Sequence, residues 1–215
     1  MSEVFDNFEQ RSEEWFALRL GIPTASEFAS IMAKGQGRTR RGYLMRLAAE
    51  RLTGELQEGY RNSHMQRGRD WEDDALDLYQ FVHNIEVKRV GFIRIMTAGG
   101  WSGCSPDGLV DPDGLVEVKT RLPALMIDAM LQDGPPGEYK PQVQGGLWIS
   151  GRRWCDLVCF NPSMPLHVVR VERDEEYIAT LADEVSKFTT ELAAIEARFG
   201  GDATAILREQ LEASL

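Results

Sequence analysis

The chain of 215 residues has few cysteines, no long hydrophobic run and no excess of basic residues. Its three cysteines, Cys104, Cys155 and Cys159, lie within segments typical of strands, and their spacing does not match a zinc knuckle. We therefore expect buried reduced thiols. No run approaches the ~18 consecutive apolar residues of a membrane span, and the first residues lack a secretory signal. These absences predict a cytoplasmic protein with no membrane contact.

Basic residues are outnumbered, because 24 Lys and Arg face 34 Asp and Glu, giving a formal net charge of −10. This balance argues against a protein that coats nucleic acid with a general basic surface. A local basic site is still compatible with the sequence, since basic residues gather in two early stretches. These are Lys34, Arg38, Arg40, Arg41, Arg46 and Arg51, followed by Arg61, Arg67 and Arg69.

With 43% hydrophobic and 27% charged residues, the composition is that of an ordinary globular protein. At roughly 100 to 200 residues per domain, the length predicts one domain. No repeat or long linker divides the chain. We expect the domain to cover residues 1–200, and residues 201–215 to form a C-terminal tail with a short peripheral helix.

Helical and strand patterns follow one another in a mixed order, which predicts an α/β fold with a mixed sheet flanked by helices. Thr24 and Glu27 form a capping-box pattern that predicts a helix from Ala25 to about Lys34. Further helices are expected at about Arg41–Leu52, Arg67–Phe81 and Tyr139–Ile149. Strands are expected at about Val87–Met96, Trp101–Val110, Leu115–Thr120, Trp154–Phe160 and Leu166–Glu172.

A last helix carries an apolar stripe at helical spacing, made by Ile178, Leu181, Val185, Phe188, Leu192 and Ile195. Such a stripe fits two interpretations, a coiled-coil face for a partner or a face that packs on the protein's own sheet. We favour packing on the protein's own sheet.

A predicted hairpin brings two acidic residues together. The segment from Asp111 to Gly114 contains Pro-Asp-Gly between two apolar runs, which is a turn signal. A turn about its centre places position 107 opposite position 118, and a one-residue bulge places it opposite 117. Either register brings the carboxylates of Asp107 and Glu117 close together. Because strand side chains alternate, Lys119 points to the same face as Glu117.

Paired carboxylates without histidine or cysteine are hard oxygen donors, which suit Mg²⁺ or Mn²⁺ better than zinc. A lysine beside such an ion can orient a water and offset charge that develops on phosphorus. Phosphodiester hydrolysis is the chemistry that this pattern predicts.

Two other interpretations of the hairpin are weaker. Asp107 could be only a turn residue, with Glu117 and Lys119 as a solvated pair. The apolar neighbours Leu115, Val116 and Val118 instead favour a buried strand. Charged side chains are unfavourable there unless they have a partner or a function. A calcium-binding EF-hand loop fails, because two positions that need an acid hold Leu109 and Thr120.

Pro106-Asp107 followed by Glu117-Val118-Lys119 resembles the PD-(D/E)xK nuclease signature. From about Glu14 to Tyr177, the sequence is similar to the phage lambda exonuclease and YqaJ-type viral recombinase family. The similar motifs are Leu18-Arg19-Leu20-Gly21, Thr24-Ala25-Ser26-Glu27, Gly68 with Trp71-Glu72 and Ala75, Cys104-Ser105-Pro106-Asp107-Gly108-Leu109, Glu117-Val118-Lys119, and Gln142-Val143-Gln144 with Trp148.

The resemblance implies a restriction-endonuclease-like fold and a set of catalytic residues. Asp107, Glu117 and the Val118 carbonyl would bind metal, and Glu72 would complete the shell of a second ion. Lys119 would position the attacking water, and Gln142 would support the same cluster.

The resemblance also implies DNA contacts. Arg19, Ser26 and Ser105 would bind the 5′-phosphate of a DNA end, and a helix start at Ser26 is favourable for an anion. A further phosphate-binding arginine of the family falls at Leu125 here, so Arg121 is the nearest candidate. Met65 would be an apolar wedge between terminal base pairs. Arg38 or Arg40 would contact the duplex backbone or minor groove.

The activity that follows is a Mg²⁺-dependent 5′→3′ exonuclease on double-stranded DNA. It would use two ions, with Mn²⁺ as a substitute, release 5′-mononucleotides and leave a 3′ overhang. The family also implies a ring-shaped homotrimer in a bacterial host cytoplasm and a phage-type single-strand annealing protein as partner. The tail beyond Gly200 differs from lambda exonuclease. The alternatives are a restriction-like or structure-selective endonuclease on the same fold, and a metal-free protein that only binds DNA ends.

Overall fold

The computed structural model describes the chain except for residues 34–37, 58–70, 133 and 201–215. The helices of the described part are α1 (Glu13–Arg19), α2 (Phe28–Met32), α3 (Arg38–Thr53), α5 (Glu72–His83), α6 (Pro123–Leu131), α7 (Lys140–Ser150) and α8 (Glu175–Phe199), with short 3₁₀ helices η1 (Ala25–Glu27) and η2 (Gly137–Tyr139). None of these helices is both long enough and apolar enough to span a membrane.

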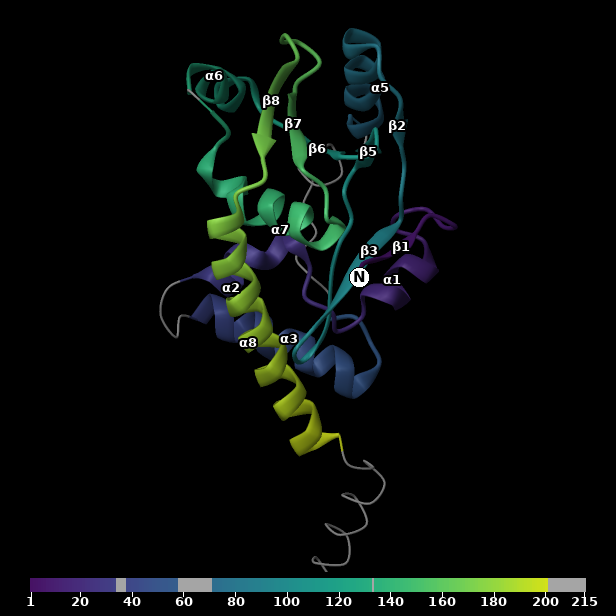
Figure 1. Cartoon of the computed structure of the whole chain (residues 1–215), viewed down its shortest axis with the longest axis vertical. Coiled ribbons are helices and arrows are strands. Elements are labelled where there is room, and N and C mark those ends of the chain that lie inside the picture. Colours follow the sequence, from purple (N-terminus) through teal and green to yellow (C-terminus); the bar gives the residue numbers. More distant parts are fainter. Residues whose placement is uncertain (34–37, 58–70, 133, 201–215) are drawn as a thin grey trace, which may run out of the picture.

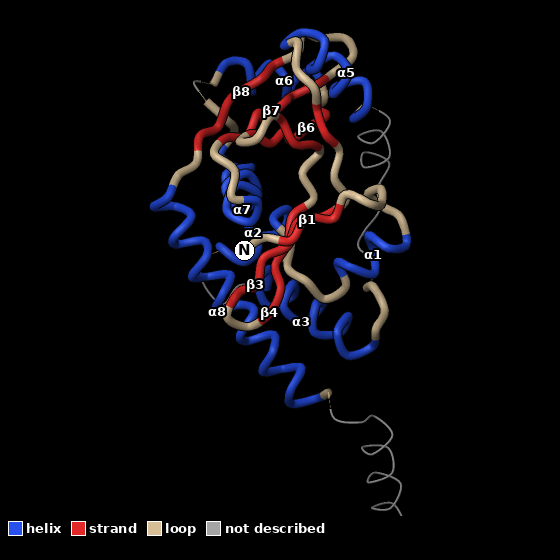
Figure 2. The backbone as a smooth tube through the Cα atoms, turned by 45° about the vertical axis from the view of Figure 1, so that its right-hand side comes forward, coloured by secondary structure: helices blue, strands red, loops and turns tan. Residues whose placement is uncertain are grey.

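The described strands form two sheets where the sequence predicted one. Strands β1 (Glu3–Phe5), β3 (Phe92–Thr97) and β4 (Gly100–Cys104) form an antiparallel sheet in the order β1-β3-β4. Strands β2 (Val87–Lys88), β5 (Gly108–Val110), β6 (Gly114–Thr120), β7 (Trp154–Phe160) and β8 (His167–Glu172) form a mixed sheet in that order, in which β6 and β7 are parallel. Figure 2 shows β1, β3 and β4 separated from β6, β7 and β8.

The predicted strands Val87–Met96 and Trp101–Val110 form one long antiparallel pair, or ribbon, that runs through both sheets. Each is divided in two, the first into β2 and β3 and the second into β4 and β5. Ile93 pairs with Cys104 in the first sheet, and Lys88 pairs with Leu109 in the second, so the register is the same on both sides. Pairing stops between these points, at residues 89–91 and 105–107. The interruption therefore lies at Ser105-Pro106-Asp107, the segment that carries the predicted catalytic aspartate.

Strand β6 separates two layers of packing. Its Val116 and Val118 pack with α5 residues such as Leu76 and Tyr79, whereas Leu115 packs in the larger core with α7. Figure 1 shows α5 and α6 at opposite sides of this sheet. Because Glu117 and Lys119 alternate with Val116 and Val118, their side chains face the α7 side.

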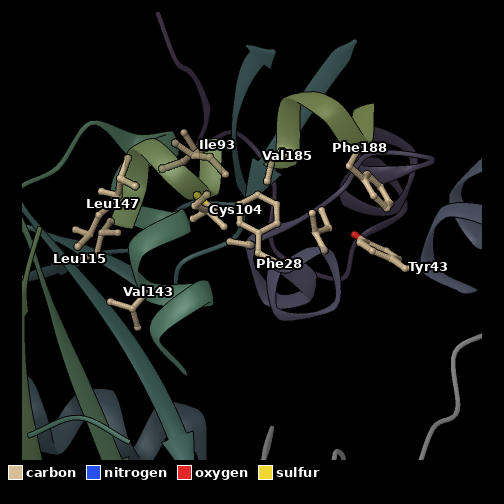
Figure 3. Packing of buried hydrophobic residues seen from close by; sticks show 14 of the residues in the cluster. Phe28, Tyr43, Ile93, Cys104, Leu115, Val143, Leu147, Val185 and Phe188 are labelled. Atoms are coloured by element: carbon tan, nitrogen blue, oxygen red, sulfur yellow. The ribbon is translucent and has the colours of Figure 1, made fainter. Parts of the chain in front are cut away.

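Helix α7 holds the two sheets together, because it contacts β3 and β4 as well as β6 and β7. Figure 3 shows the large core in which its Val143 and Leu147 meet residues of the other elements. Cys104 and Cys155 are buried in that core, and Cys159 packs with α6. All three are free thiols, as predicted.

The apolar stripe of α8 packs within the chain, as favoured. Its buried residues belong to the same core as α2, α3 and α7, and the helix also contacts β3 and β4. Figure 1 shows α8 running past α2 and α3. The stripe is thus used internally and is not a coiled-coil face.

The predicted capping box is wrong. Residues 25–32 form a 3₁₀ turn, η1, followed by the five-residue α2, and the Thr24 side chain does not cap either. Its hydroxyl contacts the Ser26 hydroxyl at 3.2 Å, and Glu27 pairs with Arg46 at 3.1 Å. The reason is tertiary, since the Thr24 amide donates to the Tyr43 hydroxyl and Thr24 bridges to Gly103 of β4.

Among the described α-helices and strands, β1, α1 and α6 were not predicted. The signal for α1 was in the sequence, because Ser12 precedes Glu13 and Glu14. The Ser12 hydroxyl accepts a hydrogen bond from the Trp15 amide, which is an N-cap. Helix α6 begins with Pro123 in its first turn, another helix-start signal.

Gly103 provides a test of the close packing in the first sheet. A Cβ at this position would overlap the ring of Phe92, which is fully buried. We expect Gly103→Ala to lower the free energy of unfolding by about 1–3 kcal/mol, measured by urea denaturation. Gly42 of α3 is the control, because a Cβ there meets open space. Gly42→Ala should raise stability by about 0.5–1 kcal/mol, and equal shifts in both variants would contradict this account.

Candidate active site

Asp107 lies beside β6, where the interruption of the ribbon leaves its side chain directed at the strand. Its Oδ2 accepts a hydrogen bond of 2.6 Å from the Val118 amide. Extending the observed register of β5 and β6 places position 107 opposite 117, which is the second of the two predicted registers. Burial, followed by the charges of Glu117 and Glu72, raises the pKa of Asp107 well above its ordinary value. The protein thus holds mutually repelling carboxylates together.

Glu117, Lys119 and Gln142 form a connected group at the same place. Lys119 Nζ lies 2.8 Å from Glu117 Oε1 and 3.1 Å from Gln142 Oε1, and Gln142 Nε2 also donates to Glu117 Oε1. Desolvation lowers the pKa of Lys119, but the charges of Glu117 and Asp107 outweigh it and the net pKa is raised. Lys119 is therefore a protonated ammonium group, suited to orient a water and offset charge rather than to remove a proton.

Glu72, the first residue of α5, lies near this group and is held by two arginines. Its carboxylate is 3.0 Å from Arg11 Nη2 and 3.4 Å from Arg89 Nη1. Arg89 also pairs with Asp73 and donates to the Asp107 carbonyl at 3.4 Å. Glu72 is thus close enough to Asp107 to affect its pKa, while its own oxygens contact guanidinium groups.

The donor set fits a hard divalent cation. Asp107 and Glu117 supply carboxylate oxygens, and the raised pKa of Asp107 reflects a site where positive charge would relieve repulsion. In the part of the chain that the structure describes, no three Asp, Glu, His or Cys side chains already lie together as a metal shell. The contacts of Glu72 with Arg11 and Arg89 are consistent with this, because its oxygens are directed to the arginines.

Arg19 and Ser105 meet on the other side of Pro106. Arg19 Nη1 donates to the Ser105 hydroxyl at 3.0 Å, and Trp15 Nε1 contacts the same oxygen at 2.9 Å. The Arg19 guanidinium lies over the Trp15 ring, 3.9 Å from its centroid. Desolvation lowers the pKa of Arg19 to about 10. A guanidinium removed from water and held by a ring and a hydroxyl is a strong site for an anion.

One pocket connects this arginine to Glu117 and Gln142. Its lining includes Arg19, Ser26 and Ser105 together with Glu117 and Gln142. Three residues predicted to bind a 5′-phosphate therefore open into the same pocket as two predicted catalytic residues, although they come from distant parts of the sequence.

Other predicted DNA contacts are placed elsewhere or are not described. Arg121 is buried, pairs with Glu138 at 2.6 Å, and is outside the lining of that pocket. Arg40 of α3 pairs with Glu191 of α8 at 2.8 Å. Arg38 is exposed at the start of α3. Met65 lies outside the described residues.

The N-terminal segment supplies residues that the sequence analysis missed. Gln10 Nε2 donates to the carbonyls of Val90 at 3.1 Å and Pro106 at 2.9 Å, across the interruption of the ribbon. Arg11 contacts Glu72, and Trp15 contacts Ser105. The spacing of Trp15 and Arg19, four residues apart on a helix, was a usable signal. The contacts of Gln10 and Arg11 join residues ~60 to 100 positions apart, and no sequence signal predicted them.

The two sheets, the flanking helices and the acidic pair with its lysine define the restriction-endonuclease-like fold of the PD-(D/E)xK nucleases. A family model described as the YqaJ-like viral recombinase domain matches residues 14–153. The chain belongs to this family. Among curated proteins, the comparison finds no significant match.

Solved structures agree with this assignment. An alkaline exonuclease from Laribacter hongkongensis, LHK-Exo, is 35% identical over 94% of this chain and 99% of that chain, with a TM-score of 0.78. The same enzyme in complex with dAMP is 37% identical over 86% and 95% of the chains, also with a TM-score of 0.78. A phage-related exonuclease from Haemophilus somnus 129PT, at 14% identity over 80% and 93% of the chains and a TM-score of 0.57, shares the fold. Together, family and structural similarity support a DNA exonuclease.

Asp107→Asn tests whether the buried carboxylate is kept for function at the expense of stability. The amide can still accept from Val118, but it removes the repulsion with Glu117 and Glu72. Because the folded pKa of Asp107 is raised, its ionised form destabilises the fold above its unfolded pKa. In EDTA at pH 8 we expect the melting temperature to rise by about 2–4 °C and the gain to shrink toward about pH 4.

The same variant should lose at least about 100-fold in cleavage rate, measured on linear duplex DNA with Mg²⁺. A variant that keeps full activity would remove Asp107 from the catalytic group. An unchanged melting temperature would show that the carboxylate repulsion carries no cost.

Proposed function

We propose that this protein is a Mg²⁺-dependent 5′→3′ exonuclease that acts on double-stranded DNA, releases 5′-mononucleotides and leaves a 3′ single-stranded overhang. The observation that carries the proposal is the pocket that joins Arg19, Ser26 and Ser105 to Glu117 and Gln142. An enzyme that cuts inside DNA needs no separate site for a terminal phosphate, whereas one that starts at a 5′ end does. The dAMP bound to LHK-Exo, a 5′-mononucleotide, is consistent with this product class.

The residues divide the reaction between them. Arg19, Ser26 and Ser105 hold the terminal phosphate, which places the next phosphate of the same strand beside Glu117 and Lys119. Lys119 orients the attacking water and offsets the charge that develops on that phosphate. Gln142 holds Glu117 and Lys119 in place. Water adds to phosphorus while the bond to the 3′ oxygen of the terminal nucleotide breaks.

Asp107, Glu117 and the Val118 carbonyl, with Glu72, are the residues that we propose hold Mg²⁺ or Mn²⁺, as two ions per site. The chemistry that these ions would supply when bound is polarisation of the phosphate and a lower pKa of the attacking water. Glu72 must turn from Arg11 and Arg89 to take part.

We further propose the assembly that the family resemblance implies, a homotrimeric ring with DNA in its channel. This arrangement reconciles an acidic protein with a DNA substrate, because an acidic exterior repels DNA while local arginines engage the threaded duplex. Arg38, Arg40, Arg121 and Met65 remain proposed DNA contacts. A phage-type annealing protein in a bacterial host cytoplasm is the proposed partner.

The function is tested by comparing linear 5′-phosphorylated duplex with the same DNA as a covalently closed circle, each with Mg²⁺ and with EDTA. We expect release of 5′-mononucleotides from the 5′-ended strand of linear DNA, only with Mg²⁺. Gels that resolve each labelled strand and chromatography of the released nucleotides give the readout.

Lys119→Ala is the control and should abolish release while the variant still folds, as checked by circular dichroism. Cutting of the circle would support the endonuclease instead. Binding of ends without any cleavage would support the metal-free end-binding protein, and loss of the 3′-ended strand would reverse the polarity.

Arg19→Ala tests the phosphate pocket. Removing the guanidinium takes away the charged donor beside Ser105, so the preference for 5′-phosphorylated over 5′-hydroxyl ends should fall by about tenfold. Initial rates on the two substrates give the preference. Arg153→Ala is the matched control, because that side chain is 77% exposed and lies outside the lining of the pocket. An unchanged preference in Arg19→Ala would exclude Arg19 from binding the terminal phosphate.

A further inference from the structure

A second hollow lies next to the Asp107 backbone, and of its lining residues only Glu72 takes part in the mechanism above. Its lining includes Arg11, Arg89 and Gln10 together with four carboxylates, those of Asp6, Glu9, Glu72 and Asp73, and it shares no residue with the pocket of Arg19. The side chains of Arg11 and Arg89 are 43% and 49% exposed. Two guanidinium groups therefore reach solvent next to the proposed catalytic group.

Arg11 has an unusual backbone. Its φ is +72°, in the left-handed region that disfavours residues with a side chain. Gln10, the residue before it, is fixed by its hydrogen bonds to Val90 and Pro106. Strain of this kind persists where the surroundings enforce it and gathers at functional sites. The structure thus directs the Arg11 side chain to Glu72 although a glycine would fit the backbone better.

The turn at Ser105-Pro106-Asp107 connects the two hollows. On one side Ser105 contacts Arg19, and on the other the Asp107 carbonyl contacts Arg89. A DNA strand with its terminal phosphate at Arg19 and its scissile phosphate at Glu117 must continue away from the Arg19 pocket. The hollow of Arg11 and Arg89 lies across the turn from that pocket.

We propose that Arg11 and Arg89 bind the backbone phosphates that directly follow the scissile phosphate along the 5′-ended strand. This inference rests on the proposed function, since it needs the terminal phosphate to lie at Arg19. A guanidinium presents five donors, and the contact of Arg11 with Glu72 in the described structure uses one of its nitrogens. A phosphate can therefore bind the other nitrogens of Arg11, and all of them once Glu72 has turned toward the metal site, and it would gain a second cation from Arg89.

The competing explanation is that the arginines only hold Glu72 and Asp73. The two explanations differ in what they require of DNA. If the arginines contact specific phosphates, the loss of DNA affinity on removing the charge of one such phosphate must depend on whether the arginines are present. If they only balance Glu72 and Asp73, removing them weakens the binding of every DNA equally, and no coupling to a particular phosphate appears.

The experiment is a double-mutant cycle on binding in the Lys119→Ala background with Mg²⁺, by fluorescence anisotropy of a 5′-phosphorylated duplex. The probes carry an uncharged methylphosphonate at the first or second phosphate after the scissile one. We expect at least one of these probes to bind about tenfold more weakly than unmodified DNA. With Arg11→Gly and Arg89→Gln added, the same replacement should change affinity less than about twofold.

Arg11→Gly alone keeps the test possible if the double variant does not fold, since glycine adopts the +72° φ without strain. Arg153→Gln is the control and should keep the full effect of the methylphosphonate. If the methylphosphonate weakens DNA binding equally with and without the two arginines, at both the first and the second phosphate, the proposal is overturned. Because the cycle measures binding alone, failure of the exonuclease assay with intact coupling would refute the proposed function separately.

Discussion

Repulsion between buried carboxylates is the constraint around which the site is organised. Burial, followed by the charges of Glu117 and Glu72, raises the pKa of Asp107, so the fold must supply stabilising contacts to keep the three carboxylates together. Parallel pairing of β6 with β7 fixes Glu117, the Val118 amide holds Asp107, and Lys119 with Gln142 neutralises and orients Glu117. The core thus keeps together carboxylates whose mutual repulsion a bound cation, alone or with a phosphate, would reduce.

The N-terminal segment serves this site more than the core. Within about ten residues, Gln10 bridges the interrupted ribbon, Arg11 contacts Glu72, and Trp15 and Arg19 contact Ser105. The hydrogen bonds of Gln10 satisfy the carbonyls of Val90 and Pro106, which lie where strand pairing stops and have no strand partner. The interruption that frees Asp107 from the ribbon is therefore stabilised by a segment that also carries the arginines.

An overall acidic chain can engage DNA because its arginines are placed individually. Arg19 lies on an aromatic ring beside a hydroxyl, and Arg11 and Arg89 lie against carboxylates. Near the site, desolvation and a low local dielectric strengthen such groups relative to the exposed negative charge elsewhere. The net charge therefore governs the long-range electrostatic interaction of the surface with DNA, but it does not set the local charge at the site.

Local sequence patterns were enough to predict the turn at Asp111–Gly114, the alternation that puts Glu117 and Lys119 on one face, the buried thiols and the internal packing of the α8 stripe. Those depend on neighbours a few residues apart, where period and turn propensity act. Contacts between distant segments account for what these patterns could not predict. The strands form two sheets, the Thr24 amide bonds to the Tyr43 hydroxyl, Arg121 pairs with Glu138, and Arg11 pairs with Glu72. These outcomes depend on contacts between segments ~20 to 100 residues apart, which local pattern does not encode.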